Sequence, residues 1–316
     1  MYDVTALGEL LIDFTMKSTD EMGYPTMEAH PGGAIPNFLA AVSKFGGHCA
    51  QLGKVGDDAF GKMLLSTLEE AGIDTTGMVV DPSVFTTLAF VTLDESGDRS
   101  FSFARKPGSD ICIRFEELDL SLIDEAKAFH FGTLSLTHEP ARTATQRAVA
   151  YAKERGKLIT FDPNLREPLW DSLEEAKQQM LWGLHQADVV KISDNEVEFL
   201  FGMAPVEGAR HLLSAFGCKL VFVTCGPEGA VYANRNTLGT APGIKSIRVA
   251  DTTGAGDIFG GSALFKLLES GKAPQELGDF ELQAITRFAC TAASLSTQKP
   301  GGVSSVPQLQ EVLAHL

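Results

Sequence analysis

The sequence predicts an α/β protein built as three layers, in which helices cover both faces of a mostly parallel central sheet. Two observations carry this prediction. From about residue 115 onward, short apolar runs alternate with amphipathic helical stretches, and residues 1–56 show the same alternation. Parallel strands need such helical crossovers, because the chain must return to the same end of the sheet. The length of 316 residues, 44% of them hydrophobic, fits one large domain with a small appendage.

The individual elements follow from composition and from signals at their ends. The chain opens on a strand, and residues 36–47 are predicted to form a helix closed by glycine, before a strand at 48–56. Residues 140–156 have the pattern of an amphipathic helix. The later strands are predicted at 128–134, 157–162, 188–193, 220–226 and 230–234.

Two segments lack the helical pattern of the rest. Residues 84–113 contain two strand-like runs joined by the turn "DESGD" at 94–98, and residues 13–31 show no helical periodicity. We expect these segments to form a small β lid over the carboxyl ends of the strands, where open α/β sheets bind ligands. Such a lid excludes water from a reaction. The large domain then comprises 1–12, 32–83 and 114–316.

Charge and cysteine content exclude several classes of partner. The chain has 26 basic and 41 acidic side chains and a net charge of −15, which disfavours nucleic acid and anionic membranes as partners. No apolar run approaches the ~18 residues of a membrane span, and the first residues have no basic lead. Five cysteines without a C-x-x-C pair predict reduced thiols and a cytoplasmic protein.

The stretch "DTTGAGD" at 251–257 directly precedes an apolar helical run. Its small residues let backbone N–H groups converge at the positive end of a helix, which attracts anions such as phosphate. Asp257 would repel a resting phosphate, unless it accepts a proton from the group that attacks one. The simpler alternative is that Asp257 only starts a helix and that the glycines only make a turn.

A second glycine-rich helix start lies near the N-terminus. Gly32 and Gly33 allow close approach of a ligand to the backbone, and Asn37 offers a donor and an acceptor together. Asp13 follows the first strand, where a carboxylate can accept two hydroxyl groups or only cap a turn. These residue types suit a ligand rich in hydroxyl groups.

Two nucleotide-binding motifs are excluded. The segment "GDDAFGKM" at 56–63 has the spacing of a P-loop, but Met63 stands where magnesium needs Ser or Thr, so we predict a turn that leads into a helix. No G-x-G-x-x-G follows the first strand, which argues against a dinucleotide-binding oxidoreductase.

Together these motifs resemble the PfkB (ribokinase-like) family of carbohydrate kinases, through "PGGAIPNFLAAVSKFG" near the start and "DTTGAGDIFGGSAL" near the end. Within that family the chain looks closest to the fructokinases, because "KVGDDAFG", "FDPNLREPLW" and "VTCGPEGA" occur in the same order and spacing over nearly the whole chain. The resemblance implies a ribokinase-like sandwich with a β lid. It also implies transfer of the γ-phosphoryl group of ATP to the 6-hydroxyl of fructose, with Mg²⁺ and potentially K⁺.

The resemblance assigns roles to individual residues. Asp257 is the general base, and the anion hole is formed by Gly254, Ala255 and Gly256. The sugar site is implied at Asp13, Gly32, Gly33, Asn37, Phe103, Arg105 and Arg166, together with Asp257. The nucleotide site is implied at Lys191, Glu196, Thr224, Gly226, Gly229 and Cys290. A monovalent cation is implied at Asp251, Thr253, Ser296, Gly301 and Ser305.

The position of the magnesium motif is open between two registers. Family members usually carry N-x-x-E after a strand, and measured from the following "FLFG" this motif falls on Ser193 and Glu196. The alternative, Asn195 and Glu198, is two residues out of step. We favour Glu196, acting on magnesium through water, since magnesium commonly keeps its hydration.

The sugar preference also has alternatives. Fructokinases often have tyrosine and asparagine around the lid arginine, where this chain has Ala104 and Lys106. Other members of the family act on 2-keto-3-deoxygluconate, ribose or nucleosides. A catalytically silent sugar-binding regulator on the same fold is the alternative from another class, and the intact "GAGD" argues against it.

We expect a homodimer through the lid. Leu88 and Phe90 lie on one face of the predicted strand, and Ala89 and Val91 on the other. A thin lid cannot bury both faces against its own domain, so a second lid would cover the exposed face. The alternative is a monomer in which the body and the bound sugar cover the two faces.

Overall fold

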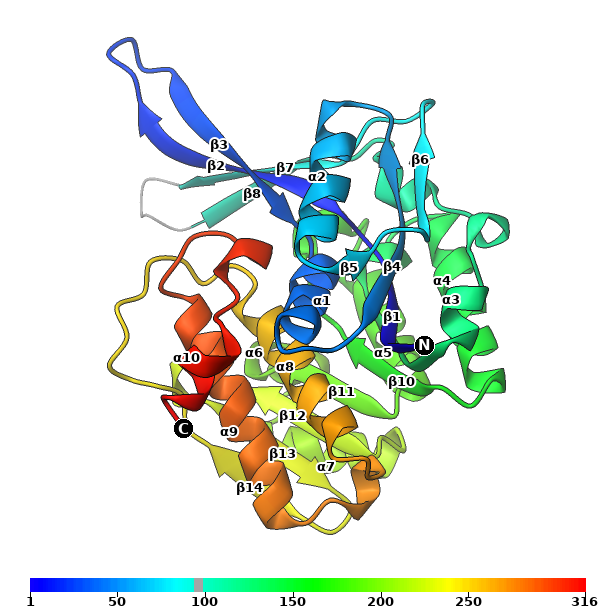
Figure 1. Cartoon of the computed structure of the whole chain (residues 1–316), viewed down its shortest axis with the longest axis vertical. Helices are drawn as coiled ribbons and strands as arrows, with labels where there is room; N and C mark the ends of the chain where they lie inside the picture. The colour runs from blue at the N-terminus through cyan, green and yellow to red at the C-terminus, as the bar shows by residue number, and fades with distance from the viewer. Residues whose placement is uncertain (94–98) are drawn as a thin grey trace.

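The computed structural model of the chain describes residues 1–93 and 99–316 (Figure 1). The predicted turn at 94–98 lies outside these residues. The described residues form a ten-stranded sheet and a separate four-stranded sheet. The large sheet consists of β1 (Tyr2–Leu7), β4 (Cys49–Gly56), β5 (Ile73–Asp74), β6 (Met78–Asp81), β9 (Ala126–Gly132), β10 (Leu158–Asp162), β11 (Val189–Ser193), β12 (Leu220–Thr224), β13 (Ala230–Asn234) and β14 (Leu238–Ala241).

The large sheet has the strand order β14-β13-β12-β11-β10-β9-β1-β4-β5, with β6 paired to β4. Its strands are parallel from β5 to β12. The strands β13 and β14 are antiparallel to their neighbours, because short turns without a crossover helix connect them. The mostly parallel sheet is therefore confirmed.

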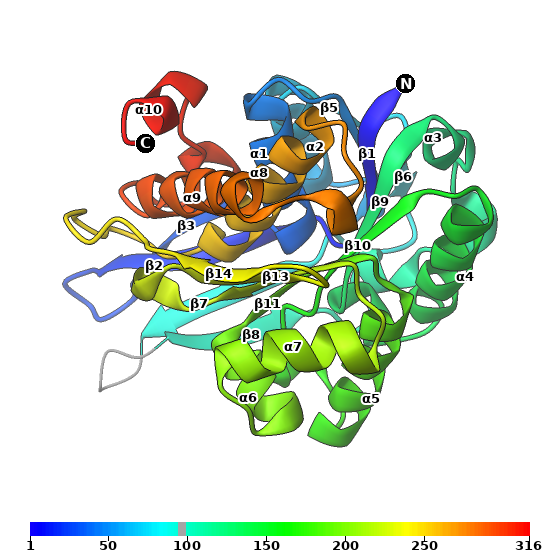
Figure 2. The ribbon, with the colours of Figure 1, turned by 90° about the horizontal axis from the view of Figure 1, so that it is seen from below.

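Helices cover both faces of this sheet (Figure 2). On one face α1, α2, α8 and α9 pack around a core that includes Ile258 and Phe288. On the other face α4, α5, α6 and α7 pack around a core that includes Phe161 and Met180. The three layers are thus confirmed. The helices are α1 (Ala34–Lys44), α2 (Ala59–Glu70), α3 (Ser121–Asp124), α4 (Ala141–Glu154), α5 (Leu173–Gln186), α6 (Asp194–Phe201), α7 (Pro205–Ala215), α8 (Ala255–Glu269), α9 (Asp279–Ser296) and α10 (Leu309–Leu313).

Two helix starts show how the local sequence works. The helix α1 begins at Ala34, two residues before the predicted start, because Pro36 is tolerated in a first turn that has no use for its missing N–H. In the excluded P-loop segment, Asp58 accepts hydrogen bonds from the N–H groups of Phe60 and Gly61 at 2.9 and 2.8 Å. Asp58 thereby caps α2, which confirms a turn that leads into a helix.

The four-stranded sheet has the order β3-β2-β7-β8 and draws on both segments that lack helical pattern. Its strands are β2 (Leu11–Thr19), β3 (Pro25–Gly32), β7 (Leu88–Leu93) and β8 (Arg99–Ala104). The β2–β3 hairpin extends well beyond the body of the molecule (Figure 1). Leu11 and Gly32, at the base of this hairpin, are joined in register, so the small sheet begins directly at the second glycine-rich helix start.

Short 3₁₀ turns connect several elements, and they lie at Ser109–Cys112, Phe115–Glu117, Leu134–Leu136, Glu167–Leu169, Gly226–Glu228, Pro274–Glu276 and Val303–Ser305. Within the described ranges, no helix combines the length and the apolar character that a membrane crossing requires.

Candidate active site

Asp257 lies in the first turn of α8 and is buried. The side-chain amide of Asn37, on α1, donates a hydrogen bond to its Oδ2 at 3.0 Å. The side-chain amide of Asn164, in the loop after β10, donates to its Oδ1 at 3.3 Å. Each carboxylate oxygen is thus held by an amide from a different part of the fold, so the orientation of Asp257 is fixed before any ligand binds.

Burial raises the pKa of the Asp257 carboxyl above its usual range. Three interactions lower this pKa and favour the charged form. They are the positive charge of Lys191, the hydrogen bond that Asn37 donates, and the positive charge of Arg166. A carboxylate whose basicity is increased by burial, while cations keep it ionised, has the character of a general base.

The glycines of the turn before Asp257 are closely surrounded by other parts of the chain. Gly254 adopts a left-handed conformation with φ 77°, and a Cβ there would lie 2.9 Å from Asn37 Nδ2 and 3.0 Å from Gly302 Cα. A Cβ on Gly256 would lie 2.9 Å from Lys191 Nζ. These positions therefore require glycine, and an anion hole at this helix start stays a prediction.

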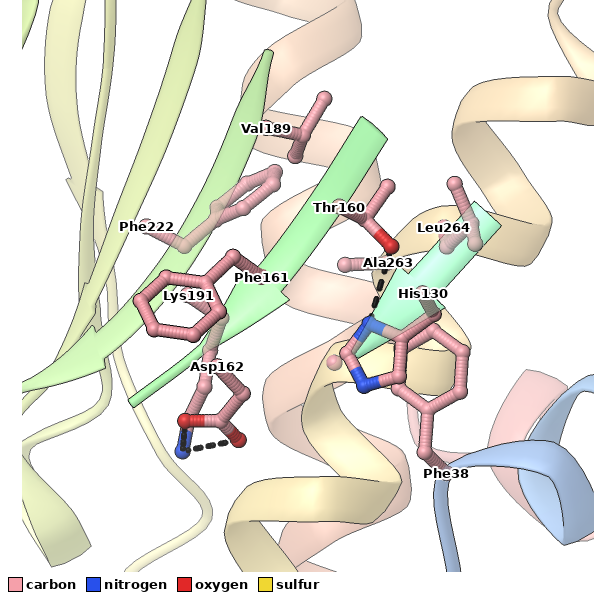
Figure 3. A pocket seen from close by; sticks show the side chains of 11 residues that line it. Phe38, His130, Thr160, Phe161, Asp162, Val189, Lys191, Phe222, Ala263 and Leu264 are labelled. Atoms are coloured by element: carbon pink, nitrogen blue, oxygen red, sulfur yellow. Dashed lines mark hydrogen bonds and ion pairs between the residues drawn. The ribbon is translucent and has the colours of Figure 1, made fainter. Parts of the chain in front are cut away.

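Lys191, predicted at the nucleotide, forms an ion pair with Asp162 at the ends of neighbouring strands, with Nζ to oxygen distances of 3.0 and 3.2 Å (Figure 3). Burial opposes the charge of Lys191, but Asp162 and two further carboxylates raise its pKa above the usual value. Because Nζ also lies beside Gly256, Lys191 brings a positive charge to the start of α8.

Asp162 and Lys191 also line a small cavity of about 20 Å³ (Figure 3). Across it the ring of His130 stacks on Phe38 at a centroid distance of 3.7 Å and hydrogen-bonds with Thr160 at 2.9 Å. Burial lowers the pKa of His130 to about 3, so this ring is neutral at physiological pH. A space of this size holds about one water molecule, so this cavity is too small to bind a sugar or a nucleotide.

The predicted sugar residues near the N-terminus converge with Asp257. The carboxylate of Asp13 lies so close to Gly32 that any Cβ there would overlap with it. Gly33 adopts φ 117°, and a Cβ there would lie 2.9 Å from the carbonyl oxygen of Glu9. Burial raises the pKa of Asp13 to about 6, and Arg166 lowers it. Asp13 thus lies against Gly32 and close enough to Arg166 and Asp257 to interact with their charges.

Glu9 is a residue that sequence reasoning missed. Gly33 has no side chain to cap α1, and the buried carboxylate of Glu9 accepts the N–H of Ala34 at 2.5 Å instead. The backbone carbonyl of Glu9 accepts a hydrogen bond from Gln51 at 3.3 Å. Glu9 thus fixes the glycine pair and, through α1, the position of Asn37. No local signal reveals this cap, because it joins residues 25 positions apart.

Glu9→Gln is expected to be more stable, relative to the wild type, at about pH 8 than at about pH 5. Burial raises the pKa of Glu9 from 4.5 to about 7, so the fold favours its protonated form. Stability from this group is therefore present below about 4.5 and is lost as pH rises through about 7, whereas glutamine does not titrate. Chemical denaturation of both proteins measures the difference, and Asp13 and other titrating groups cancel in it. An equal difference at both pH values contradicts the prediction.

The predicted lid residues are placed differently from one another. Phe103 is opposite Ala89, which is opposite Asp13, so these three residues share the face of the small sheet that carries Asp13. Arg105 is buried, and its Nε and Nη2 donate to Asp110 at 2.8 and 2.5 Å. Its remaining bonds go to the hydroxyl of Thr137 and the carbonyl of Leu134. Arg105 therefore joins the end of β8 to the body, and its contact with a sugar stays a prediction.

Of the other predicted nucleotide residues, Thr224 ends β12, Gly226 and Gly229 follow it, and Cys290 lies on α9. Gly226, next after Cys225, has φ 53°, and a Cβ there would meet no heavy atom within 4 Å, so the backbone is open to a ligand. A Cβ on Gly229 would instead overlap with the carbonyl of Ala241, and the buried Cys290 sulfur lies 3.7 Å from the same oxygen. Packing thus accounts for Gly229 and Cys290, whereas Gly226 and Thr224 remain the candidates for contact.

Glu196 is the residue predicted to hold magnesium, and its carboxylate also accepts hydrogen bonds from its own chain. Its Oε1 accepts the N–H of Leu165 at 2.7 Å, and its Oε2 accepts the N–H and the hydroxyl of Ser193 at 2.8 and 2.9 Å. The free lone pair on Oε1 suits a hydrated magnesium ion, which would be held through water. In the described part of the chain, no three His, Cys, Asp or Glu side chains form a direct metal site.

The residues predicted for a monovalent cation come together from two loops. Asp251 Oδ1 accepts the N–H of Thr253 at 2.9 Å, and its Oδ2 accepts the N–H of Gly301 at 3.1 Å. Ser296 ends α9 shortly before this contact, and the hydroxyl of Ser305 donates to the carbonyl of Gly302 at 2.8 Å. The loops at 250–254 and 297–305 are therefore joined beside the start of α8, and a monovalent cation there stays a prediction.

The whole chain also matches known proteins. Residues 1–309 match the model of the pfkB family carbohydrate kinases. Fructokinase-1 of Zea mays is 42% identical over 313 residues, which cover 98% of this chain and 96% of the relative.

Solved structures also match nearly the whole chain. The fructokinase from Xylella fastidiosa with bound ATP has a TM-score of 0.89 and 29% identity, with 99% of this chain and 98% of the other covered. The fructokinase from Vibrio cholerae, with fructose, ADP and calcium bound, has a TM-score of 0.87 and 30% identity at the same coverage. A double mutant of the Vibrio cholerae enzyme with fructose, ADP and potassium matches to the same degree. The chain belongs to the pfkB family of carbohydrate kinases.

Proposed function

We propose that this chain is an ATP-dependent fructokinase, which transfers the γ-phosphoryl group of ATP to the 6-hydroxyl of D-fructose. The observation that carries the proposal is the buried carboxylate of Asp257, which is oriented by two amides and lies next to the anion-binding start of α8. The fructokinase relatives at about 40% identity support fructose as the acceptor.

In the proposed reaction Asp257 accepts the proton of the attacking hydroxyl as the new O–P bond forms and the bond to ADP breaks. Negative charge spreads over the oxygens of the transferred group, and the N–H groups at 254–256 stabilise it. Lys191, fixed under Gly256, and Arg166, near Asp257 and Asp13, add positive charge to a protein that is acidic overall. The carboxylate of Asp13 accepts hydrogen bonds from sugar hydroxyl groups.

The cofactors are ATP and a divalent cation, which we propose to be Mg²⁺, with K⁺ at the second cation site. A bound magnesium ion would neutralise negative charge on the phosphate groups of ATP. Glu196 would hold it through water. The calcium and potassium in the Vibrio cholerae structures support both kinds of site.

We propose that the four-stranded sheet at 13–31 and 84–113 closes as a lid over the sugar, while the rest of the chain forms one large domain. Asp13 and Phe103 lie on the same face of the sheet, so closure would bring both to the sugar and would exclude water. We place the protein in the cytoplasm, since the five cysteines are all free thiols in the structure.

A homodimer is expected, through the opposite face of the lid. Phe14 stacks on Phe90 at 5.3 Å and meets Phe60 of α2 at 5.6 Å, and Phe60 contacts Phe85 at 6.4 Å. Phe85 remains 55% exposed, so this aromatic cluster is only partly covered by its own chain. Light scattering coupled to size exclusion should give about twice the chain mass of 33.8 kDa, and Phe85→Asp should give the single mass.

Phe85→Asp is a sharper probe than Phe90→Asp, because Phe90 packs within its own chain. Phe280→Asp is the matched control, since Phe280 is 83% exposed on α9 and should stay dimeric. A wild-type mass near 33.8 kDa at micromolar concentration, with and without fructose, excludes the dimer. A dimeric Phe85→Asp variant excludes this interface.

Turnover of a panel of acceptors tests the function. A coupled assay that detects ADP should give the highest kcat/KM with fructose, above ribose, 2-keto-3-deoxygluconate and nucleosides. Preference for one of these others would assign the chain to another activity of the same family. Sugar binding by calorimetry without ATP turnover on any acceptor would indicate a sugar-binding regulator.

A further inference from the structure

Each residue of the loop at 162–165 is anchored to a different neighbour. Asp162 pairs with Lys191, and the carbonyl of Pro163 accepts the hydroxyl of Thr133. Asn164 donates to Asp257, and the N–H of Leu165 donates to Glu196. A loop held at consecutive residues has little freedom, so its geometry is set by the surrounding strands and by α8.

Asn164 has the strained conformation of this loop. It is buried, with φ 44°, and among the residues that the structure describes it is the one non-glycine residue with positive φ. Asparagine tolerates this conformation better than most residues, yet glycine tolerates it best. Strain of this kind persists where surrounding contacts impose it, and it is concentrated at functional sites. Here the amide is aimed at Oδ1 of the proposed base.

We propose that Asn164 is a positioning residue for phosphoryl transfer, which holds Asp257 in its ionised form and in the orientation needed to accept the hydroxyl proton. The inference rests on the proposed role of Asp257 as the base. Asn37 alone orients one oxygen, Oδ2, and leaves the carboxylate free to rotate. The second amide removes this freedom, and a hydrogen bond to a carboxylate favours its charged form.

Glu196 has a second task in this proposal. Its Oε1 holds the N–H that follows Asn164 at 2.7 Å, and it thereby keeps Asn164 in the left-handed conformation. The residue predicted to organise magnesium is thus mechanically joined to the base through one peptide unit. A bound metal complex and a correctly placed base would then depend on the same loop.

The charged surroundings of Asp257 make the effect measurable. The cations Lys191 and Arg166 favour its ionised form, and the nearby carboxylates oppose it. The carboxylates that face it are Glu196, Asp162, Asp13 and Glu9. Since burial already favours the neutral form, loss of one donor should move the protonation of the base toward neutral pH.

The test is the pH profile of kcat/KM for fructose in Asn164→Gly and Asn164→Asp. Asn164→Gly removes the donor but accepts the backbone conformation, so its acid limb should move upward by about one pH unit. On the acid limb itself, activity at a given pH should fall about 10-fold, and it should recover at higher pH. Asn164→Asp places a like charge beside the base and should move the limb further, by about two units. The affinity for ATP should stay within about twofold in both variants.

Asn236→Asp is the matched control, because Asn236 is an exposed turn residue after β13 and should keep the wild-type profile. If Asn164 only forms the turn, Asn164→Gly will keep the wild-type acid limb, and this result would overturn the inference. Asp257→Asn separates the two levels. An active Asp257→Asn enzyme refutes the proposed base itself, whereas an inactive one together with an unshifted Asn164→Gly profile refutes only the role of Asn164.

Discussion

Asp257→Asn is expected to lower kcat for fructose phosphorylation by about 10²–10⁴-fold while it leaves fructose affinity within a few-fold of the wild type. The asparagine side chain fills the same volume but cannot accept the hydroxyl proton at neutral pH. Asp257 is buried between α1 and the loop after β10, where the amides of Asn37 and Asn164 both donate to it. Steady-state kinetics gives kcat, and calorimetry without nucleotide gives the sugar affinity.

The substitution also changes the hydrogen bonds of the site. Asn37 and Asn164 both donate to Asp257, whereas an asparagine at 257 would offer only one acceptor oxygen. One of the two amides must therefore change its orientation. The site then loses part of its fixed geometry in addition to the base. Asp171→Asn, at an exposed position, should keep wild-type kinetics. Turnover of the folded Asp257→Asn variant near the wild-type rate would remove Asp257 from the mechanism.

The sequence allowed the layers to be predicted, because each strand and helix carries its own periodic pattern. The buried strands and their crossover helices read directly as a parallel sheet, and only the last two strands depart from it. The start of α1 was missed by two residues because its cap, Glu9, comes from far away in the sequence. Local patterns cannot reveal a cap of that kind.

The sequence pointed to those parts of the candidate site that lie within a recognisable motif. The glycines around 254 and the aspartate that follows them were compatible with anion binding and proton transfer, and the resemblance to the PfkB family favoured this interpretation over a plain helix start. Asn164 stood in the quoted stretch "FDPNLR", but its left-handed backbone and its contact with Asp257 come from tertiary structure. The contact of Arg105 with a sugar stays a prediction, but its pairing with the buried Asp110 could not be predicted from the sequence. Partners of buried charges are set by the fold and not by spacing.

Gly254→Val is expected to lower kcat by about 10²–10³-fold, because it disturbs the anion hole and the base together. Gly254 has φ 77°, which a β-branched residue adopts only with strain. A Cβ there would lie 2.9 Å from Asn37 Nδ2, so the valine would push away the amide that orients Asp257. It would also shield the N–H groups that face the transferred phosphoryl group. Single-turnover kinetics with saturating ATP measures the chemical step directly.

A control at the other end of α8 separates the effect of Gly254→Val on stability from its effect on catalysis. Gly271 follows the C-terminal end of α8 with φ 66°, and a Cβ there would meet no heavy atom within 4 Å. Gly271→Val thus imposes a similar backbone strain without a contact to the site, and it should lower the melting temperature but keep kcat. If Gly254→Val lowers the melting temperature equally and keeps kcat as well, the start of α8 has no part in phosphoryl transfer. A selective loss of kcat in Gly254→Val would instead show that this turn takes part in phosphoryl transfer, through the anion hole, through the orientation of Asp257 or through both.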